Sequence, residues 1–128
     1  MKRSTIDWVK KAEGDWEAAL RLYRARKQAH YDVVCYLAQQ RAEKYLKAEL
    51  NEAGVNFAKT HDLPELLIQA ETVESALAVL QPQVDFLDEF SVLYRYPGRD
   101  ATKAQAQQAI KDCRSLRKVM RTLFGLPI

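Results

Sequence analysis

The sequence predicts an all-α protein, folded as an up-and-down bundle of four to five helices. Composition is the first reason, because glycine and proline occur only four times each and helix-favouring Ala, Leu, Gln, Lys, Arg and Glu dominate. The second reason is spacing, because apolar residues recur every three or four positions through most of the chain. No segment shows the alternation that is typical of a strand.

The length of 128 residues suits one domain, which we expect to span residues 1–128. With 48% apolar and 29% charged residues, the chain has the composition of a folded globule. No apolar run approaches the roughly 20 residues that span a bilayer, and no secretory signal follows Met1. We therefore expect a cytoplasmic protein that makes no membrane contact.

Five helices and one shorter helical piece are expected from the apolar spacing. The helices cover about residues 5–27, 31–53, 63–70, 82–94 and 101–124, and the shorter piece lies around 73–80. Gly54 suits the end of the second helix. Asp62 and Glu65 form a pattern that caps the start of the third, and Pro82 breaks or kinks the chain.

The second helix contains an unusual mixture of polar, charged and apolar residues in the stretch CYLAQQRAEKYLKAEL, residues 35–50. Gln40, Glu43, Lys44 and Lys47 gather opposite its apolar arc, and Glu43 and Lys47 have the spacing of an ion pair. Helical geometry alone interprets this cluster as a solvated face. Arg41, like Gln39 and Glu49, instead projects toward the apolar arc and needs a partner there.

Several stretches, in this order and spacing, resemble the HEPN domain family of prokaryotes and higher eukaryotes. They are WVKKAEGDWEAALRLYRARKQAHYD (8–32), YDVVCYLAQQRAEKYLKAEL (31–50), KTHDLPELL (59–67) and LYRYPG (93–98). The Gln-Gln-x-x-Glu-Lys-x-x-Lys run is the most specific part. The resemblance covers nearly the whole chain, from about residue 6 to residue 124.

The resemblance implies an α-helical bundle that commonly forms a homodimer. It also implies a bacterial or archaeal protein, often paired with a minimal nucleotidyltransferase in a toxin–antitoxin system. The family was proposed to bind nucleotides, and many members are RNase toxins. Those nucleases carry an Arg followed, after four to six residues, by a His, which both chains contribute at a dimer interface.

This chain departs from the nuclease motif. Its two histidines are His30 and His61, and Arg24 with His30 has the bare spacing but lies at the end of the first helix, where the family does not carry its motif. The segment that resembles the functional one, LYRYPGRD, offers Arg95 and Arg99 without a histidine downstream. The resemblance therefore predicts a non-catalytic module here.

The sequence predicts a ligand- or partner-binding surface on three parts of the chain. The candidate residues are Gln40, Glu43, Lys44, Lys47, His61, Arg95, Tyr96 and Arg99. Arginine suits phosphate or carboxylate because its planar group donates two parallel hydrogen bonds. Simpler interpretations stay open: His61 orders the turn before the third helix, and Arg95 complements a helix C-terminus.

The sequence gives no sign of a metal site or cofactor. Cys35 and Cys113 lie in apolar helical patterns, which predicts buried free thiols. Asp85, Asp88 and Glu89 favour the start of a helix and are interpreted as a solvated face. No glycine-rich phosphate loop occurs. Lys and Arg load both terminal helices, so one side of the domain is basic if these helices are neighbours.

The function predicted from these features is a binding module that pairs with a small nucleotidyltransferase and binds a nucleotide or an RNA phosphate. Two alternatives stay open. One is a metal-independent RNase toxin that uses Arg95 with His61 from elsewhere in the dimer. The other is a plain helical dimerisation adaptor without a ligand.

Overall fold

The structure is a computed structural model that describes residues 1–25, 30–57, 59–91, 97–98 and 100–128. Its elements are α1 (Arg3–Tyr23), α2 (Tyr31–Glu52), α3 (Leu63–Val73), the 3-10 helix η1 (Ser75–Leu80), α4 (Gln81–Asp88) and α5 (Lys103–Leu123). The described residues contain no strand. The predicted all-α fold is confirmed.

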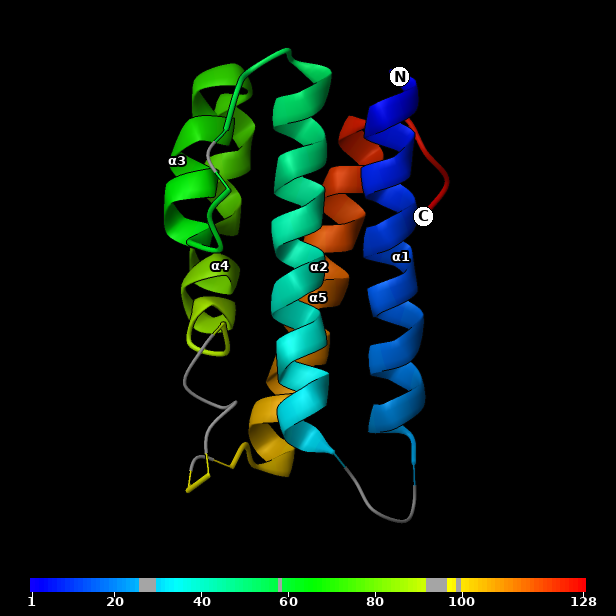
Figure 1. The fold of residues 1–128 in the computed structure, drawn as a ribbon, viewed down its shortest axis with the longest axis vertical. Coiled ribbons are helices and arrows are strands. Elements are labelled where there is room, and N and C mark those ends of the chain that lie inside the picture. Colours follow the sequence, from blue (N-terminus) through cyan, green and yellow to red (C-terminus); the bar gives the residue numbers. More distant parts are fainter. Residues whose placement is uncertain (26–29, 58, 92–96, 99) are drawn as a thin grey trace.

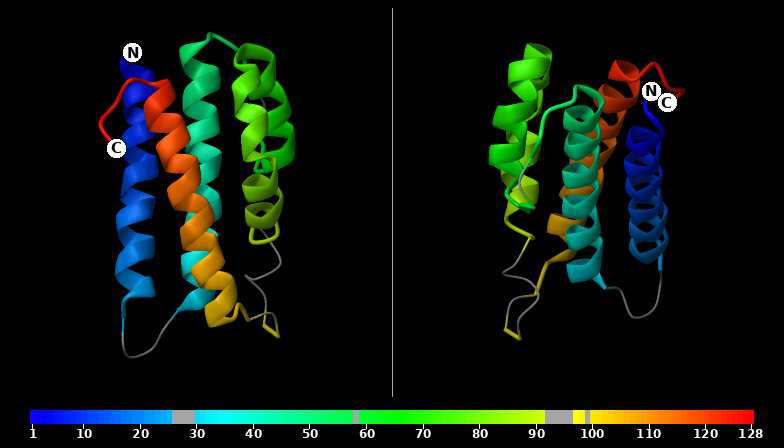
Figure 2. Two further views of the ribbon diagram at one scale, coloured as in Figure 1. Left: turned by 180° about the vertical axis from the view of Figure 1, so that it is seen from behind. Right: turned by 45° about the horizontal axis from the view of Figure 1, so that its top comes forward.

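The elements form a bundle around α2 (Figure 1). Helix α1 lies on one side of α2, and α3 with η1 and α4 lies on the other. Seen from behind, α5 crosses the back of α2 between these two flanks (Figure 2). Helix α1 begins at the end of the bundle where α5 ends, so the two chain termini lie close together.

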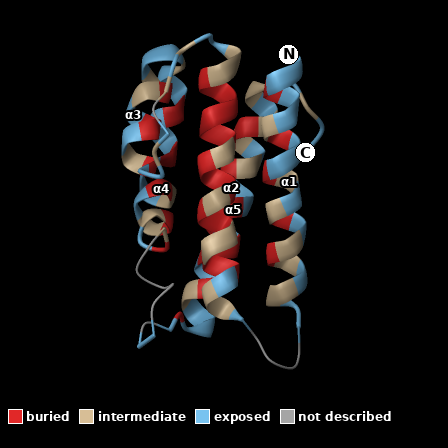
Figure 3. Cartoon of the chain, viewed as in Figure 1, coloured by how far each residue is buried: buried red, intermediate tan, exposed pale blue. Residues whose placement is uncertain are grey.

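Helix α2 is enclosed by its neighbours more completely than any other described element. From Arg41 to Leu50 every residue is buried except Lys44, which is partly buried (Figure 3). Small residues such as Ala38, Ala42 and Ala48 allow the neighbouring helices to approach closely. The enclosure means that every charged side chain in this stretch must find a partner inside the protein.

The predicted helix ends are largely confirmed. The Asp62 side chain accepts a hydrogen bond from the Glu65 amide at 3.1 Å, as an N-cap should. Gly54 follows α2 with a φ of +73°, a conformation that glycine adopts without a steric penalty. Pro82 lies in the first turn of α4, where its missing N–H costs nothing.

Two predicted helices end earlier than expected. The first, expected to reach residue 27, ends at Tyr23, and residues 26–27 of that prediction lie outside the described part. The helix expected over residues 82–94 ends at Asp88, and the chain then turns so that Phe90 is buried. Residues 92–94 of that prediction lie outside the described part. The apolar spacing from Val84 to Phe90 reflects core contacts on both sides of the turn, so it did not show where the helix stops.

The predicted burial of both thiols is confirmed. Cys35 and Cys113 are buried and free. Burial, with the charge of Asp32 beside it, raises the pKa of the Cys35 thiol to about 12, which keeps it protonated and unreactive near neutral pH. None of the helices in the described part is long and apolar enough to cross a membrane.

Candidate functional site

The polar cluster predicted on α2 lies inside the fold. Glu43 and Lys47 are only 3% and 6% exposed, so the interpretation as a solvated face is wrong for this pair. Their side chains are bonded, with 3.1 Å between Lys47 Nζ and Glu43 Oε2. The ring of His61 approaches the other Glu43 oxygen at 2.8 Å from Nδ1. The chain between α2 and α3 covers this face of α2, and a helical wheel cannot show that.

The remaining members of the cluster also bind within the chain. The Lys44 ammonium lies 2.5 Å from a carboxylate oxygen of Asp15 on α1. The Gln40 side-chain amide donates to the side-chain oxygen of Gln39 at 2.8 Å. Lys47 lies over the rings of Trp8 and Phe57, 5.7 Å and 5.9 Å from their centroids. These contacts join α2 to α1 and to the following connection. Binding of a ligand or partner by this cluster stays a prediction.

Of the other predicted site residues, only His61 lies in the described part of the chain. His61 belongs to the connection before α3, and its side chain is 66% exposed apart from the contact with Glu43. Arg95, Tyr96 and Arg99 lie outside the described residues. Arg24 follows the last residue of α1 and His30 precedes α2, and residues 26–29 between them are also outside the described part.

Arg41 is charged yet completely buried in the core. Its guanidinium packs over the rings of Trp16 and Tyr45, with Cζ 4.4 Å and 5.3 Å from their centroids. Nη1 donates to the Cys113 carbonyl at 3.2 Å, whereas the buried Nε and Nη2 have no hydrogen-bond partner among the described residues. Nη2 nevertheless lies 3.6 Å from a Glu13 oxygen, so Glu13 serves as a counterion of this buried charge.

Glu13 connects α1 to both α2 and α5. Arg117 donates to both carboxylate oxygens at 3.1 Å and 3.2 Å, and Arg121 donates at 3.3 Å. The Tyr45 hydroxyl donates to the same group. Burial by itself raises the pKa of Glu13, but the bonds from Tyr45 and Arg117 and the charge of Arg41 outweigh burial and hold that pKa below its ordinary value. Three arginines thus share the Glu13 carboxylate as a counterion in this half of the α1–α5 contact.

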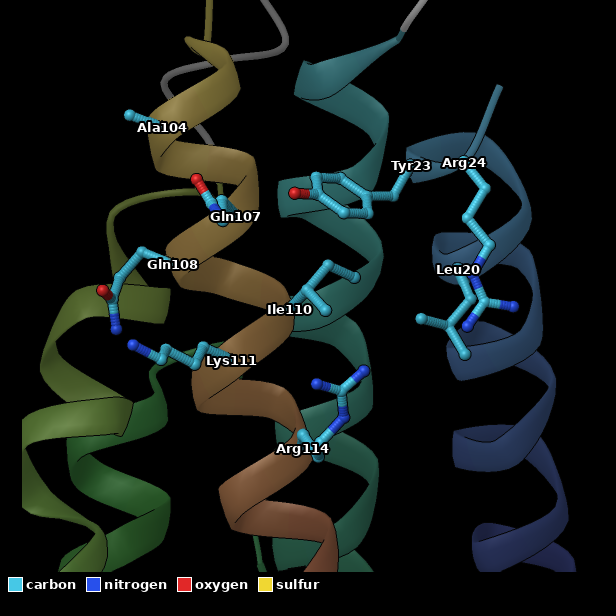
Figure 4. A pocket seen from close by; sticks show the side chains of 9 residues that line it. All are labelled: Leu20, Tyr23, Arg24, Ala104, Gln107, Gln108, Ile110, Lys111 and Arg114. Atoms are coloured by element: carbon cyan, nitrogen blue, oxygen red, sulfur yellow. The ribbon is translucent and has the colours of Figure 1, made fainter. Parts of the chain in front are cut away.

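The other half of the α1–α5 contact is an open groove of about 490 Å³. Its walls are Leu20, Tyr23 and Arg24 of α1 and Ala104, Gln107, Gln108, Ile110, Lys111 and Arg114 of α5. Arg24 lies beside Leu20 on the α1 wall and Arg114 lies on the α5 wall, whereas the Tyr23 ring reaches across toward α5 (Figure 4). No carboxylate of the described residues lines this groove, which we call the α1–α5 groove.

The comparisons with known proteins decide the family. The family model of the HEPN domain matches residues 5–123, nearly the full length of the chain. The chain belongs to the HEPN domain family. Among solved structures, the archaeal HEPN homologue ST0689 is 27% identical, with a TM-score of 0.75 over 96% of this chain and 98% of that one.

A second solved structure shares the HEPN fold of this chain. The protein TT1696 from Thermus thermophilus is 21% identical, with a TM-score of 0.80 over 95% of this chain and 98% of that one. No curated protein matches. The family resemblance predicted from the motifs is thus confirmed, and the same motif residues now have positions in the fold.

The described part of this HEPN domain offers no group of three or more residues suited to hold a metal ion. Asp85 and Glu89 are exposed, as predicted. Asp88 is partly buried and accepts from the Leu63 amide at 3.3 Å, so it ties α4 to α3. Burial, more than the nearby Asp62 and Asp85, raises its pKa.

The sequence analysis did not predict the α1–α5 groove of this HEPN domain as a candidate site. It did expect a basic side if the terminal helices are neighbours, and the bonds from Glu13 to α5 show that they are. The signal in the sequence was the set of cations three, four or seven positions apart on α5: Lys111, Arg114, Lys118 and Arg121. The sequence did not show that Glu13 lies against the arginines of one half of the contact and that no carboxylate lines the other half.

Proposed function

We propose that this HEPN domain is a binding module whose α1–α5 groove holds the phosphate of a nucleotide or of RNA. The observation that carries the proposal is the presence of Arg24 and Arg114 on opposite walls of a groove whose described lining carries no carboxylate (Figure 4). A phosphate between two guanidinium groups accepts parallel charge-assisted hydrogen bonds from each. Lys111 adds a third positive charge at the same place.

The position of Arg114 is partly fixed before any ligand arrives. Its Cζ lies 5.7 Å from the ring centroid of Trp16, a buried residue of α1 whose ring also contacts Arg41. An arginine held against an aromatic ring loses less conformational entropy on binding than a free surface arginine. This restraint supports binding to Arg114 over binding to the other exposed cations of α5.

The groove also suits the rest of a nucleotide. The Tyr23 ring and the Ile110 side chain offer apolar surface on which a base can stack, and the Gln107 amide can donate and accept hydrogen bonds. A volume of about 490 Å³ falls within the range of small-molecule sites. The groove is partly open to solvent, so the phosphate of a free nucleotide and that of an RNA strand can both approach it.

We assign no catalysis to the groove. A proton-transferring residue near neutral pH would be a histidine, and none of the described residues that line the groove is one. His61 is bonded to Glu43 in the connection before α3, away from the groove. The alternative RNase activity needs Arg95, which lies outside the described residues, together with His61. Growth arrest on expression, relieved by Arg95→Ala, would favour that alternative over our proposal.

The test of phosphate binding compares three probes and a matched control. Inorganic phosphate, ATP and a short single-stranded RNA are titrated against the full chain, followed by the melting temperature and by fluorescence anisotropy. We expect Arg24→Ala and Arg114→Ala each to weaken binding by about tenfold. Lys11→Ala removes an exposed α1 cation that lines no described cavity, and we expect it to change affinity less than twofold.

Each outcome has a defined meaning. Binding of ATP alone identifies a free nucleotide, and stronger binding of RNA with a steep salt dependence identifies a strand. No binding of any probe would contradict the proposal and favour the plain adaptor. Equal loss with Lys11→Ala would also contradict it, because the effect would then be general electrostatics.

Pairing with a small nucleotidyltransferase and formation of a homodimer are part of the same proposal, supported by membership of the HEPN family. Co-expression with a nucleotidyltransferase encoded next to this chain, followed by size-exclusion chromatography, tests both. We expect a complex that elutes larger than either protein, and a homodimer without the partner. Monomeric elution without a complex would contradict this part of the proposal while leaving the phosphate measurement intact.

A further inference from the structure

The α1–α5 groove contains more positive than negative charge, and this excess bears on the kind of phosphate that it binds. Its charged lining residues in the described chain are Arg24 of α1 and Lys111 and Arg114 of α5. Neither Arg24 nor Arg114 forms an ion pair with a described residue. Their two charges are therefore uncompensated within the part of the chain that the structure describes.

The third cation of the groove has a carboxylate beside it. Lys111 extends from α5 on the side away from α1 (Figure 4), and Asp112 follows it in the sequence. Asp112 is buried and accepts a hydrogen bond from the Gln108 side chain at 2.8 Å. Burial raises the pKa of Asp112, and the charge of Lys111 opposes that rise. With Asp112 set against Lys111, the charges of Arg24 and Arg114 remain as an excess of two.

The depression next to the groove does not remove this excess. It has a volume of about 410 Å³ and shares Leu20 and Arg24 with the groove. Its other charged lining residues in the described chain are Glu17 and Arg21 of α1, whose charges offset each other. The carboxylate of Glu17 therefore has a cation of its own on the same helix and leaves Arg24 available.

The core beside the groove adds further positive charge. The Trp16 ring that holds Arg114 also contacts Arg41, whose Cζ lies 4.4 Å from the ring centroid. Arg41 shares the carboxylate of Glu13 with two arginines of α5, so three cations have one counterion there. Two further positive charges thus lie beyond the Trp16 ring. The buried surroundings weaken their screening by water, so they add to the attraction that the groove exerts on an anion.

We infer that the α1–α5 groove selects the doubly charged terminal phosphate of a nucleotide or of an RNA end over the singly charged phosphodiester inside a strand. This inference rests on the proposed function and specifies which phosphate that site takes. A phosphate monoester carries close to two negative charges above about pH 6. The monoester therefore matches the excess of two positive charges, whereas a diester leaves half of that excess uncompensated.

The hydrogen-bond donors of the groove favour the same ligand. A bidentate bond from one guanidinium group uses two phosphate oxygens. A diester has two free oxygens, so a single arginine occupies both of them. A monoester has three, which allows Arg24 on one wall and Arg114 on the other to bind the same phosphate and share one oxygen (Figure 4).

The test compares adenosine 5′-monophosphate with its methyl ester, which has one negative charge and one free oxygen fewer. Both are titrated against the full chain by calorimetry at about pH 7.5 and constant ionic strength. We expect the monophosphate to bind about tenfold more tightly. At about pH 5.5 its phosphate is largely singly charged, and the preference should fall to about threefold. No described lining residue is a histidine, the side chain that would change its charge in this interval.

Two matched variants locate the selection. Arg24→Gln removes one charge from the groove, and we expect the preference for the monophosphate to fall to about threefold at pH 7.5. Lys11→Gln removes one charge from an exposed position of α1 that lines no described cavity, and the preference should stay the same. Both variants should melt close to the parent chain, because both positions are exposed.

A pair of RNAs distinguishes the two sources of a terminal phosphate. The pair consists of one short RNA sequence with a 5′-phosphate and with a 5′-hydroxyl group. Tighter binding of the phosphorylated strand by about tenfold supports the inference and assigns the groove to an RNA end. Selection of the monophosphate over its methyl ester without a difference between the two strands also supports it and assigns the groove to a free nucleotide.

Two results would overturn the inference while leaving the proposed function intact. One is equal binding of the monophosphate and its methyl ester, with both weakened by Arg114→Ala. The other is a preference for the monophosphate that Arg24→Gln and Lys11→Gln reduce to the same extent, because the selection would then reflect the charge of the whole chain. Absence of binding by both nucleotides and both RNAs would overturn the proposed function as well, so the two failures are distinguishable.

Discussion

The two halves of the α1–α5 contact use similar residues for opposite purposes. Near the chain termini, Arg117 and Arg121 of α5 bind the carboxylate of Glu13, with Arg41 behind them. Toward the other end, Arg114 of α5 faces Arg24 of α1, and no carboxylate of the described chain lines the space between. One half is a closed ion-pair network, and the other is an open cationic groove.

This difference indicates that one carboxylate decides whether neighbouring arginines stabilise the fold or stay available to bind an external anion. Arg41, Arg117 and Arg121 share Glu13 as a counterion within the chain, and these contacts hold three helices together. Arginines without such a partner keep their hydrogen-bond donors for an external anion. The row of cations on α5 continues through both halves, so the distinction comes from α1.

The largest expected effect is the removal of Arg41 from the closed half. Arg41→Ala leaves a cavity beside Trp16 and Tyr45 and removes a counterion of Glu13, so we expect a loss of about 4 kcal/mol in the free energy of unfolding. Arg41→Met fills most of the space without a buried charge and should lose less than half as much. Urea denaturation measures both, and a loss below about 1 kcal/mol for Arg41→Ala would show that the buried charge is not integral to the core.

The next effect is the neutralisation of Glu13 itself. Glu13→Gln keeps the size of the side chain but leaves Arg41, Arg117 and Arg121 without their shared carboxylate. We expect a loss of about 2 kcal/mol, because the carboxylate is partly exposed and water screens some of the interaction. Glu17→Gln, an exposed carboxylate one turn further along α1, is the control and should lie within about 0.5 kcal/mol of the parent chain.

The open half can be converted toward the closed one by adding a carboxylate. Gln107→Glu places one on the α5 wall of the groove, opposite Tyr23 and Arg24. We expect the affinity for the phosphate probe to fall by about tenfold, which is about 1.4 kcal/mol, with little change in melting temperature. Ser115→Glu adds the same charge outside the groove and serves as the control. Unchanged affinity for Gln107→Glu would mean that phosphate binds elsewhere.

The smallest effect concerns pH. The pKa of Glu13 is held below its ordinary value of 4.5, so its contribution to stability is complete above that pH and is lost as the pH falls through the folded pKa. The stability difference between the parent chain and Glu13→Gln should therefore shrink as the pH falls from 7 to 3. Unfolding curves at four or five pH values measure it, and a constant difference would mean that the carboxylate is not stabilised in the folded state.

Much of the fold could be predicted because helical signals are local. Apolar spacing indicated each element, and the end signals Asp62 and Gly54 were correct because a cap depends on residues three or four positions apart. The same locality explains the error after Asp88. A turn that buries Phe90 keeps the apolar spacing of a helix, so only the path of the chain reveals the end.

The site was harder because it depends on what covers each helix face. The Glu43–Lys47 pair was predicted from its spacing, but its burial comes from Phe57 and Trp8, one in the connection before α3 and one on α1. The groove residue Arg114 stood in the sequence as one cation among several on α5. Nothing within that helix distinguishes it from Arg117, since the difference is whether Glu13 is near.

The sequence by itself determined the all-α class, the positions of the helices and the HEPN motifs, because these depend on residues close together in the chain. Only the tertiary structure decided which charges meet. It enclosed Glu43 and Arg41 in the core, placed Glu13 against one half of α5 and left Arg24 and Arg114 facing each other. Charges interact through space, and their partners here lie about 20 to 110 positions away in the chain, beyond any periodic pattern.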